Sequence, residues 1–128
     1  MMIKKTQADS QTLSQVIING LIERKGKDIV LLDLRHLQKA VVDYFVICTG
    51  TSDTHVNALK DAVEIQVKRE LAEYARSVEG ERKGEWVLID YIDVVVHIFQ
   101  EEKRQRYDIE ELWGDAKRIR FSDEGKML

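Results

Sequence analysis

The 128-residue sequence has no proline, a single cysteine and no long apolar run. A lone cysteine, Cys48, excludes an internal disulfide framework and a cysteine-rich zinc site. The most apolar stretches, residues 29–34 and 94–99, are interrupted by Asp33 and His97 and have the length of strands, well short of the ~20 residues of a membrane helix. The sequence turns polar directly after its first three residues, so we expect no signal peptide, no membrane partner and a cytoplasmic protein.

Charge of one sign is also scarce, with 20 Lys and Arg against 23 Asp and Glu and a net charge of −3. This balance excludes a basic field over the whole domain and argues against DNA binding, although a local basic patch stays possible. A hydrophobic fraction of 44% is enough for one packed core. We therefore predict a single domain over 1–128, with its core at about 9–121 and loose ends at 1–8 and 122–128.

The apolar periodicity alternates between helix and strand. The prediction is an α/β fold with a mixed sheet of about five strands flanked by helices. Residues 35–42 are ambiguous and could form a short turn of helix. The expected helices cover about 9–25 and 53–76, with one or two short ones in 100–120, and the clearest strands cover 29–34, 44–49, 86–91 and 93–99.

The last two of these strands form a predicted hairpin with a very tight turn at Tyr91 and Ile92. Pairing Asp90 with Asp93 would place Trp86 opposite His97. One face of the hairpin is then wholly apolar and belongs to the core: Val87, Ile89, Val94, Val96 and Ile98. The other mixes aromatic, acidic and histidine side chains, as a half-wet recognition surface does: Trp86, Leu88, Asp90, Asp93, Val95, His97 and Phe99.

Signals for catalysis are weak. The turn from Thr49 to Ser52 ends a strand and opens a helix, where free N–H groups could bind a phosphate, but it matches no phosphate-binding motif and can equally be a helix cap. Asp90 and Asp93 stand three apart across a turn and do not form the carboxylate pair of a magnesium site. The three histidines are scattered. We therefore expect no enzyme, no cofactor and no metal site, with a nucleotide-binding or nucleotidyltransferase-like enzyme using the Gly50–Ser52 turn as the alternative.

Several ordered motifs resemble the ribosomal silencing factor family, also called Iojap-like proteins. The resemblance covers about residues 10–115. Its motifs are Asp28-Ile29-Val30-Leu31-Leu32-Asp33-Leu34, Asp43-Tyr44-Phe45-Val46-Ile47-Cys48-Thr49-Gly50-Thr51-Ser52, His55-Val56, Glu79-Gly80, the run 86–99, Arg104, Tyr107-Asp108-Ile109-Glu110 and Leu112-Trp113.

The resemblance implies a mixed α/β fold similar to nucleotidyltransferases, without transferase activity. It further implies a translational repressor that binds the large ribosomal subunit through its protein fourteen, on the face that meets the small subunit. Occupying this place would sterically block subunit joining and lower translation in starvation or stationary phase. The family also implies a homodimer when free, and a self-complementary Trp86 face is a third possibility.

The expected partner-binding residues surround a central tryptophan, as in an interface hot spot. They are Trp86, Leu88, Asp90, Tyr91, Asp93, His97 and Glu79. Acidic groups near Trp86 would suit a basic ribosomal protein. Two positions depart from the family pattern. Ile92 stands where glycine is usual in the turn, so either the turn is of another type or the strands pair less tightly. Arg106 stands where an apolar residue is usual, which would loosen the packing of the tail.

Overall fold

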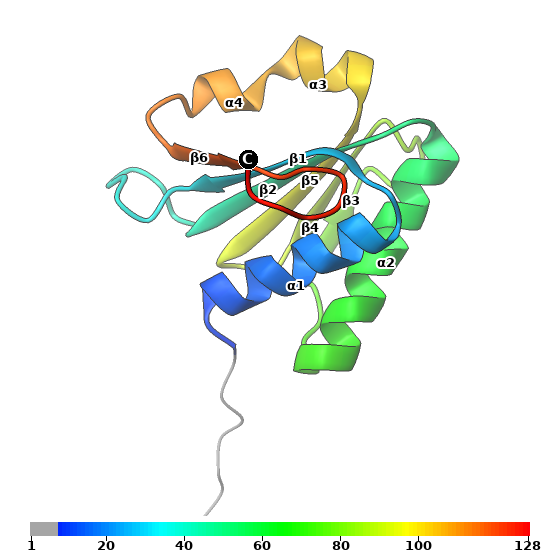
Figure 1. Ribbon diagram of the computed structural model, residues 1–128, viewed down its shortest axis with the longest axis horizontal. Coiled ribbons are helices and arrows are strands. Elements are labelled where there is room, and N and C mark those ends of the chain that lie inside the picture. The colour runs from blue at the N-terminus through cyan, green and yellow to red at the C-terminus, as the bar shows by residue number, and fades with distance from the viewer. Residues whose placement is uncertain (1–7) are drawn as a thin grey trace, which may run out of the picture.

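The computed structural model describes residues 8–128, which form a six-stranded mixed sheet with helices on both faces (Figure 1). The strand order is β3-β4-β5-β2-β1-β6, and β2 and β5 run parallel while the other neighbours are antiparallel. Residues 1–7, most of the predicted N-terminal loose end, lie outside the described residues. The elements are α1 (Ser10–Glu23), β1 (Lys27–Asp33), β2 (Tyr44–Gly50), α2 (Asp53–Leu71), β3 (Ser77–Glu79), β4 (Trp86–Asp90), β5 (Val94–Gln100), α3 (Glu101–Tyr107), α4 (Ile109–Leu112) and β6 (Lys117–Arg120).

The predicted fold class is confirmed, and the two long helices begin at the expected caps. The Asp9 carboxylate accepts a hydrogen bond from the Thr12 N–H (2.7 Å), and the Ser52 hydroxyl accepts one from the His55 N–H (3.0 Å). The second helix ends at Leu71, earlier than predicted, because Ala72 takes a left-handed conformation. Residues 35–42 form turns rather than helix.

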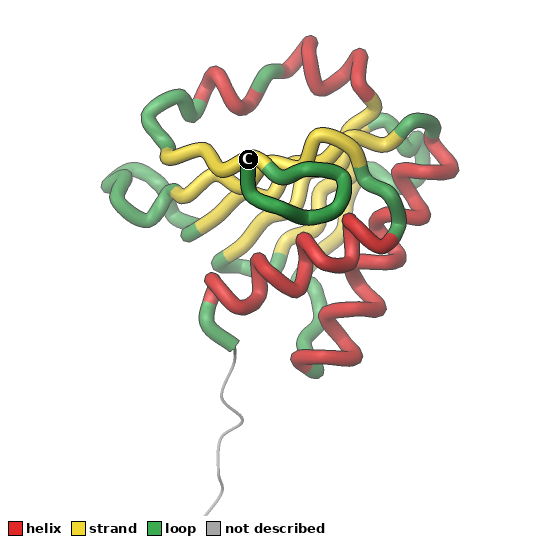
Figure 2. The backbone as a smooth tube through the Cα atoms, in the orientation of Figure 1, coloured by secondary structure: helices red, strands yellow, loops and turns green. Residues whose placement is uncertain are grey.

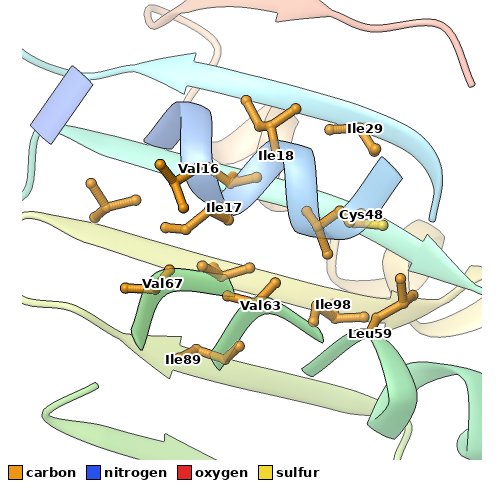
Figure 3. Close-up of a cluster of buried hydrophobic side chains, with 14 of the residues drawn as sticks. Val16, Ile17, Ile18, Ile29, Cys48, Leu59, Val63, Val67, Ile89 and Ile98 are labelled. Carbon is orange, nitrogen blue, oxygen red and sulfur yellow. The ribbon is translucent and has the colours of Figure 1, made fainter. Parts of the chain in front are cut away.

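The main core lies between one face of the sheet and the helices α1 and α2 (Figure 3). Ile17 of α1 and Val63 of α2 are fully buried against Ile98 and Ile89 of the hairpin. Burying one such side chain stabilises the fold by roughly 1.5–3 kcal/mol. The apolar hairpin face predicted from the sequence is therefore part of this core.

The helices α3 and α4 lie over the opposite face of the sheet (Figure 2). A second, smaller core lies beneath them. Its buried members include Phe99 of β5 and Ile109 of α4, with Trp86 and Trp113 packed against them. Arg104 of α3 connects this layer to the sheet through hydrogen bonds to Asp28 and Thr49. This layer places the end of α3 beside the start of β4.

The hairpin register differs from the predicted one by two residues. Asp90 pairs with Val95 rather than Asp93, and Trp86 pairs with Phe99 rather than His97. The turn enclosed by Asp90 and Val95 has four residues, 91–94, two more than the assumed pairing of Asp90 with Asp93 encloses, and within it the Tyr91 N–H donates to the Val94 carbonyl (2.9 Å). Because side chains alternate with a period of two, a shift of two leaves every residue on its predicted face.

Ile92 at the tip of this turn has a backbone φ of 77°, which L-residues with a branched β-carbon rarely adopt. The Asp93 N–H donates to the Tyr91 carbonyl (3.0 Å), and the Ile92 N–H donates to the Asp90 carboxylate (2.7 Å). Ile92 thus takes a left-handed conformation that glycine adopts without strain, and hydrogen bonds on both sides hold it there.

Replacing Ile92 by glycine is expected to raise the free energy of unfolding by about 1 kcal/mol. Relief of the strained φ raises the free energy of unfolding by roughly 1–3 kcal/mol. The greater freedom of glycine in the unfolded chain lowers it by roughly 0.5–1 kcal/mol. Since Ile92 is 51% exposed, little apolar burial is lost. Urea denaturation measures the effect, with Ile92→Ala as the control that shortens the side chain but keeps the strain. A glycine variant no more stable than the alanine variant would contradict this account.

The C-terminal segment is not the loose end predicted for 122–128. It turns back on β6 and lies beside the sheet (Figure 1). Phe121 bridges to Met127, and the Leu128 N–H donates to the Arg120 carbonyl (2.8 Å). The polar composition of the segment hid this contact, because its order comes from backbone hydrogen bonds rather than burial of side chains.

Candidate partner-binding surface

Trp86, the first residue of β4, is half-buried at the boundary between the second core and solvent. Its ring stacks on Phe99 of β5, with centroids 4.8 Å apart and planes at 26°. On another side it meets the ring of Tyr107 at 4.8 Å, and Tyr107 is 51% exposed. Trp86 and Tyr107 therefore form an aromatic pair that packs on Phe99 and is partly accessible to solvent.

The loop before Trp86 is tied to the end of β5, which fixes where β4 begins. The Gln100 N–H donates to the Glu85 carbonyl (2.9 Å), and the Gln100 side-chain amide donates to the Gly84 carbonyl (2.9 Å). Gly84 has a φ of 66°, and a β-carbon there would lie 2.8 Å from that of Asp53. Glycine is needed at this position both for the conformation and for the close approach to α2.

His97 contacts Trp86 from the protein interior. The Trp86 indole N–H donates to His97 Nδ1 at 3.1 Å, and the Phe45 ring meets the imidazole edge-on at 4.8 Å. His97 is only 5% exposed, and this burial lowers its pKa to about 4. The imidazole is therefore neutral near pH 7, with Nδ1 as a hydrogen-bond acceptor.

The structure buries two of the residues expected to contact the partner. His97 lies inside the second core, and Tyr91 is 6% exposed and packs into the main core. Burial raises the pKa of Tyr91 above its ordinary value, with the carboxylates of Glu64 and Glu73 adding to the shift. The alternation along β5 was correct, but the cover that the Phe45 and Trp86 rings give His97 could not be seen from that strand itself.

The other expected residues lie on or beside this face. Leu88 is half-buried, and Glu79 stands directly opposite it on the edge strand β3. Asp90 lies at the far end of β4, and Asp93 is exposed in the turn. We name Glu79, Trp86, Leu88 and Tyr107 the Trp86 surface.

Tyr107 is the member of the Trp86 surface that is not among the residues expected from the sequence. It belongs to a short helix, and only the tertiary position of that helix over the sheet brings it against Trp86. Its place in the family motif beside Trp113 was the one available signal.

The charge around Trp86 is less acidic than expected. A hollow of about 350 Å³ beside it is lined by Arg82, Lys83 and Lys103 as well as Glu85, and Lys103 lies 3.8 Å from that glutamate. The negative charge of Glu85 is thus partly neutralised. The sequence did not predict this, because Lys103 is distant from Arg82 and Lys83 along the chain.

Asp90 is also neutralised, at the far end of β4. It is paired with Arg76 at 2.6 Å. Burial alone would raise the pKa of Asp90, but the hydrogen bonds from Arg76 and the Ile92 N–H lower the pKa overall.

The Gly50 turn is built as a helix cap. A β-carbon on Gly50 would lie 2.8 Å from a methyl group of Val56, so close packing accounts for the glycine. The Thr51 N–H donates to His55 Nδ1 (2.9 Å), and His55 Nε2 is 3.0 Å from the Arg24 carbonyl, which it can reach as a donor. The chain itself therefore uses donors that a phosphate would need.

Arg106 is exposed and does not face the second core, so the expectation that it loosens the tail is wrong. Within residues 8–128, no three histidine, cysteine or carboxylate side chains are placed to hold a metal ion. No helix in the same range is long and apolar enough to span a membrane.

Comparison with known proteins decides the family. The model of a family described as "Ribosomal silencing factor during starvation" matches residues 7–127. The chain belongs to this family. It is similar to the ribosomal silencing factor RsfS of Halalkalibacterium halodurans, with 36% identity over 84% of this chain and 90% of the relative. A crystal structure of a protein from Chromobacterium violaceum has 38% identity and a TM-score of 0.78 over 84% of this chain and 88% of its own.

A more distant relative is the mouse protein named "Mitochondrial assembly of ribosomal large subunit protein 1". It is 29% identical over 77% of this chain, and the match spans 43% of the mouse protein. Family membership implies the ribosome as a partner and is consistent with a regulatory protein rather than an enzyme. The resemblance read from the ordered motifs is thus confirmed.

Proposed function

We propose that the protein is a translational repressor that binds the large ribosomal subunit through the Trp86 surface. Bound there, it would sterically block joining with the small subunit and lower translation in starvation or stationary phase, within the cytoplasm. The family name supports silencing of the ribosome, and the name of the mouse relative supports the choice of the large subunit. The partner we propose is protein fourteen of the large subunit, as the family resemblance implies.

The observation that carries this proposal is the supported aromatic pair. Trp86 and the half-exposed Tyr107 lie in contact, and Phe99 and His97 hold Trp86 from inside the protein. Interface hot spots have this anatomy, with tryptophan and tyrosine at the centre and polar groups around them. Steric occlusion needs no chemical step, which fits a surface without a catalytic carboxylate pair.

The charged residues around Trp86 and Tyr107 favour a partner that carries both basic and acidic side chains at the edge of its binding surface. Glu79, opposite Leu88, would attract basic side chains of a ribosomal protein. Arg82 and Lys83 lie on the other side of Trp86 and would attract acidic side chains. Rim charges of this kind guide orientation and association rate more than they add affinity.

Sedimentation of purified subunits through a sucrose gradient, with and without the protein, tests the proposal. We expect the protein to migrate with the large subunit and the joined-ribosome peak to shrink. A protein that stays at the top of the gradient while joining is unaffected would overturn the proposal. We also propose that the free protein is a homodimer, as the family resemblance implies, and light scattering at two concentrations tests this separately.

Replacing Trp86 by alanine is expected to weaken large-subunit binding about thirtyfold, which corresponds to roughly 2 kcal/mol. The fold should survive, since the residue is half-buried and the main core is on the other face of the sheet. Binding is measured by titration of labelled protein with large subunits. Trp113→Ala is the matched control, because Trp113 packs on Phe45, away from Trp86. Unchanged affinity of the Trp86 variant, with a native circular dichroism spectrum, would remove Trp86 from the site.

A further inference from the structure

We propose that His97 is a positioning residue, which fixes the orientation of the Trp86 indole without itself touching the partner. This inference rests on the proposed function, because it assigns the support of the same surface. It also changes the role expected from the sequence, where His97 was taken as a contact residue.

The ring of Trp86 needs two restraints to present one edge to a partner. Stacking on Phe99 sets the plane of the indole, but rotation by about 180° about its outer torsion would keep a ring stacked and exchange its edges. The hydrogen bond from the indole N–H to His97 Nδ1 (3.1 Å) selects one of these two orientations. The opposite edge of the ring is then the one available near Tyr107 and the hollow beside it.

The imidazole is itself held firmly. His97 lies within β5, whose neighbours on both sides are strands of the sheet, and its ring packs edge-on against Phe45. Its 5% exposure leaves no surface for direct contact with another macromolecule. The support under Trp86 is therefore a rigid part of the sheet.

The second ring nitrogen of His97, Nε2, is buried and unpaired in the described part of the chain, which is unfavourable for a residue that only fills space. With Nδ1 accepting from Trp86, the proton of the neutral ring is on Nε2, and Nε2 is buried without a hydrogen-bond partner among the described residues. Burying an unpaired donor is unfavourable, so an apolar side chain would be the better choice for packing alone. Among residues 8–128, the imidazole makes one hydrogen bond, which it accepts from Trp86, and we assign the role of the histidine to this bond.

An isosteric pair of variants separates the acceptor from the packing. His97→Asn places an amide oxygen at the branch position of Nδ1 and can still accept the bond, whereas His97→Leu has the same branching and no acceptor. We expect His97→Leu to bind the large subunit up to about tenfold more weakly, the equivalent of one lost hydrogen bond, and His97→Asn to bind within about threefold of the parent.

A spectroscopic readout does not depend on the ribosome. The sequence has two tryptophans, so Trp113→Phe leaves Trp86 as the only one. In that background the fluorescence anisotropy of the free protein should decay faster for His97→Leu than for His97→Asn. Equal decay in the two variants would overturn the proposal even if neither variant binds as the parent does.

A double-mutant cycle distinguishes positioning from a general structural effect. Trp86→Phe removes the indole N–H but keeps an aromatic ring, so His97→Leu should weaken binding no further in that background. A loss of the same size in both backgrounds would show that His97 acts on the fold and not on Trp86, and would overturn the inference.

Failure of the inference and failure of the proposed function are distinct results. If Trp86→Ala loses binding while His97→Leu and His97→Asn both bind as the parent does, the surface stands and the positioning role is wrong. If the unmodified protein does not migrate with the large subunit, the proposed function is wrong, and the anisotropy comparison still decides whether His97 orients Trp86.

Discussion

Replacing Arg104 by methionine is expected to lower the free energy of unfolding by about 3–5 kcal/mol, the usual cost of leaving a buried charge unpaired. The guanidinium, on a residue only 9% exposed, donates to the Glu110 carboxylate (2.9 Å), to the Asp28 carbonyl (2.7 Å) and to the Thr49 hydroxyl (2.8 Å). One side chain thus joins α3, α4, β1 and β2. Methionine fills a similar volume but leaves all three acceptors without this donor.

The Asp28 carbonyl explains much of the expected cost. The pairing of β1 with β2 shifts by one residue between Lys27 and Val30, and Asp28 has a φ of 48° within this bulge. A bulge leaves a backbone group outside the ladder of the sheet, and here the guanidinium satisfies it. Removing Arg104 would leave a carbonyl unpaired as well as a carboxylate.

The same helix offers a matched control. Arg106 lies two residues further along α3 and is exposed, so Arg106→Met should change stability by no more than about 0.5 kcal/mol. Urea denaturation followed by circular dichroism gives both values. Equal effects of the two substitutions would show that the contacts of Arg104 contribute little.

The position of Tyr107 depends on the same contacts, since it ends the helix that Arg104 fastens. We therefore expect Arg104→Met to weaken large-subunit binding even at temperatures where it stays folded. The structural and functional roles of the second core are linked through this residue.

Periodicity predicted the two long helices and the four main strands because each buries a continuous apolar face. Strands β3 and β6 escaped prediction since they have three and four residues, are largely polar and lie at the edges of the sheet. Edge strands need little apolar patterning, because one side of each is open to solvent.

The candidate site was predicted in part, for a physical reason that Trp86 and His97 illustrate. Alternation along the hairpin placed both on the face opposite the main core, and that placement survived a register error of two residues. What alternation cannot supply is the cover on that face. The Phe45 and Trp86 rings lie against His97, and Tyr107 of α3 lies against Trp86. These are contacts between segments separated in the sequence.

Acidification is expected to destabilise the protein through His97 before the carboxylates respond. Burial lowers the pKa of the folded imidazole to about 4, whereas the unfolded chain has the ordinary value near 6.5. Between these values the unfolded state binds a proton that the folded state does not, so stability falls as pH decreases from about 6.5 to about 4. Above pH 6.5 the imidazole is neutral in both states and adds no pH dependence. The expected total loss is about 3 kcal/mol.

Carboxylates with a lowered pKa act in a separate, more acidic range. The pKa of Asp33 is lowered chiefly by its hydrogen bond from Arg35. The pKa of Asp90 is lowered, against the effect of burial, by its hydrogen bonds from Arg76 and the Ile92 N–H. Their stabilising effect is complete above the ordinary carboxyl pKa near 4 and is lost as pH falls below it. Urea denaturation at several values between pH 7 and pH 4.5 therefore isolates the histidine. His97→Asn should show a much flatter dependence than the parent over this range, while both lose stability below it. Parallel curves for parent and variant would mean that protonation of the buried imidazole is not what opposes folding, and that another group titrates there.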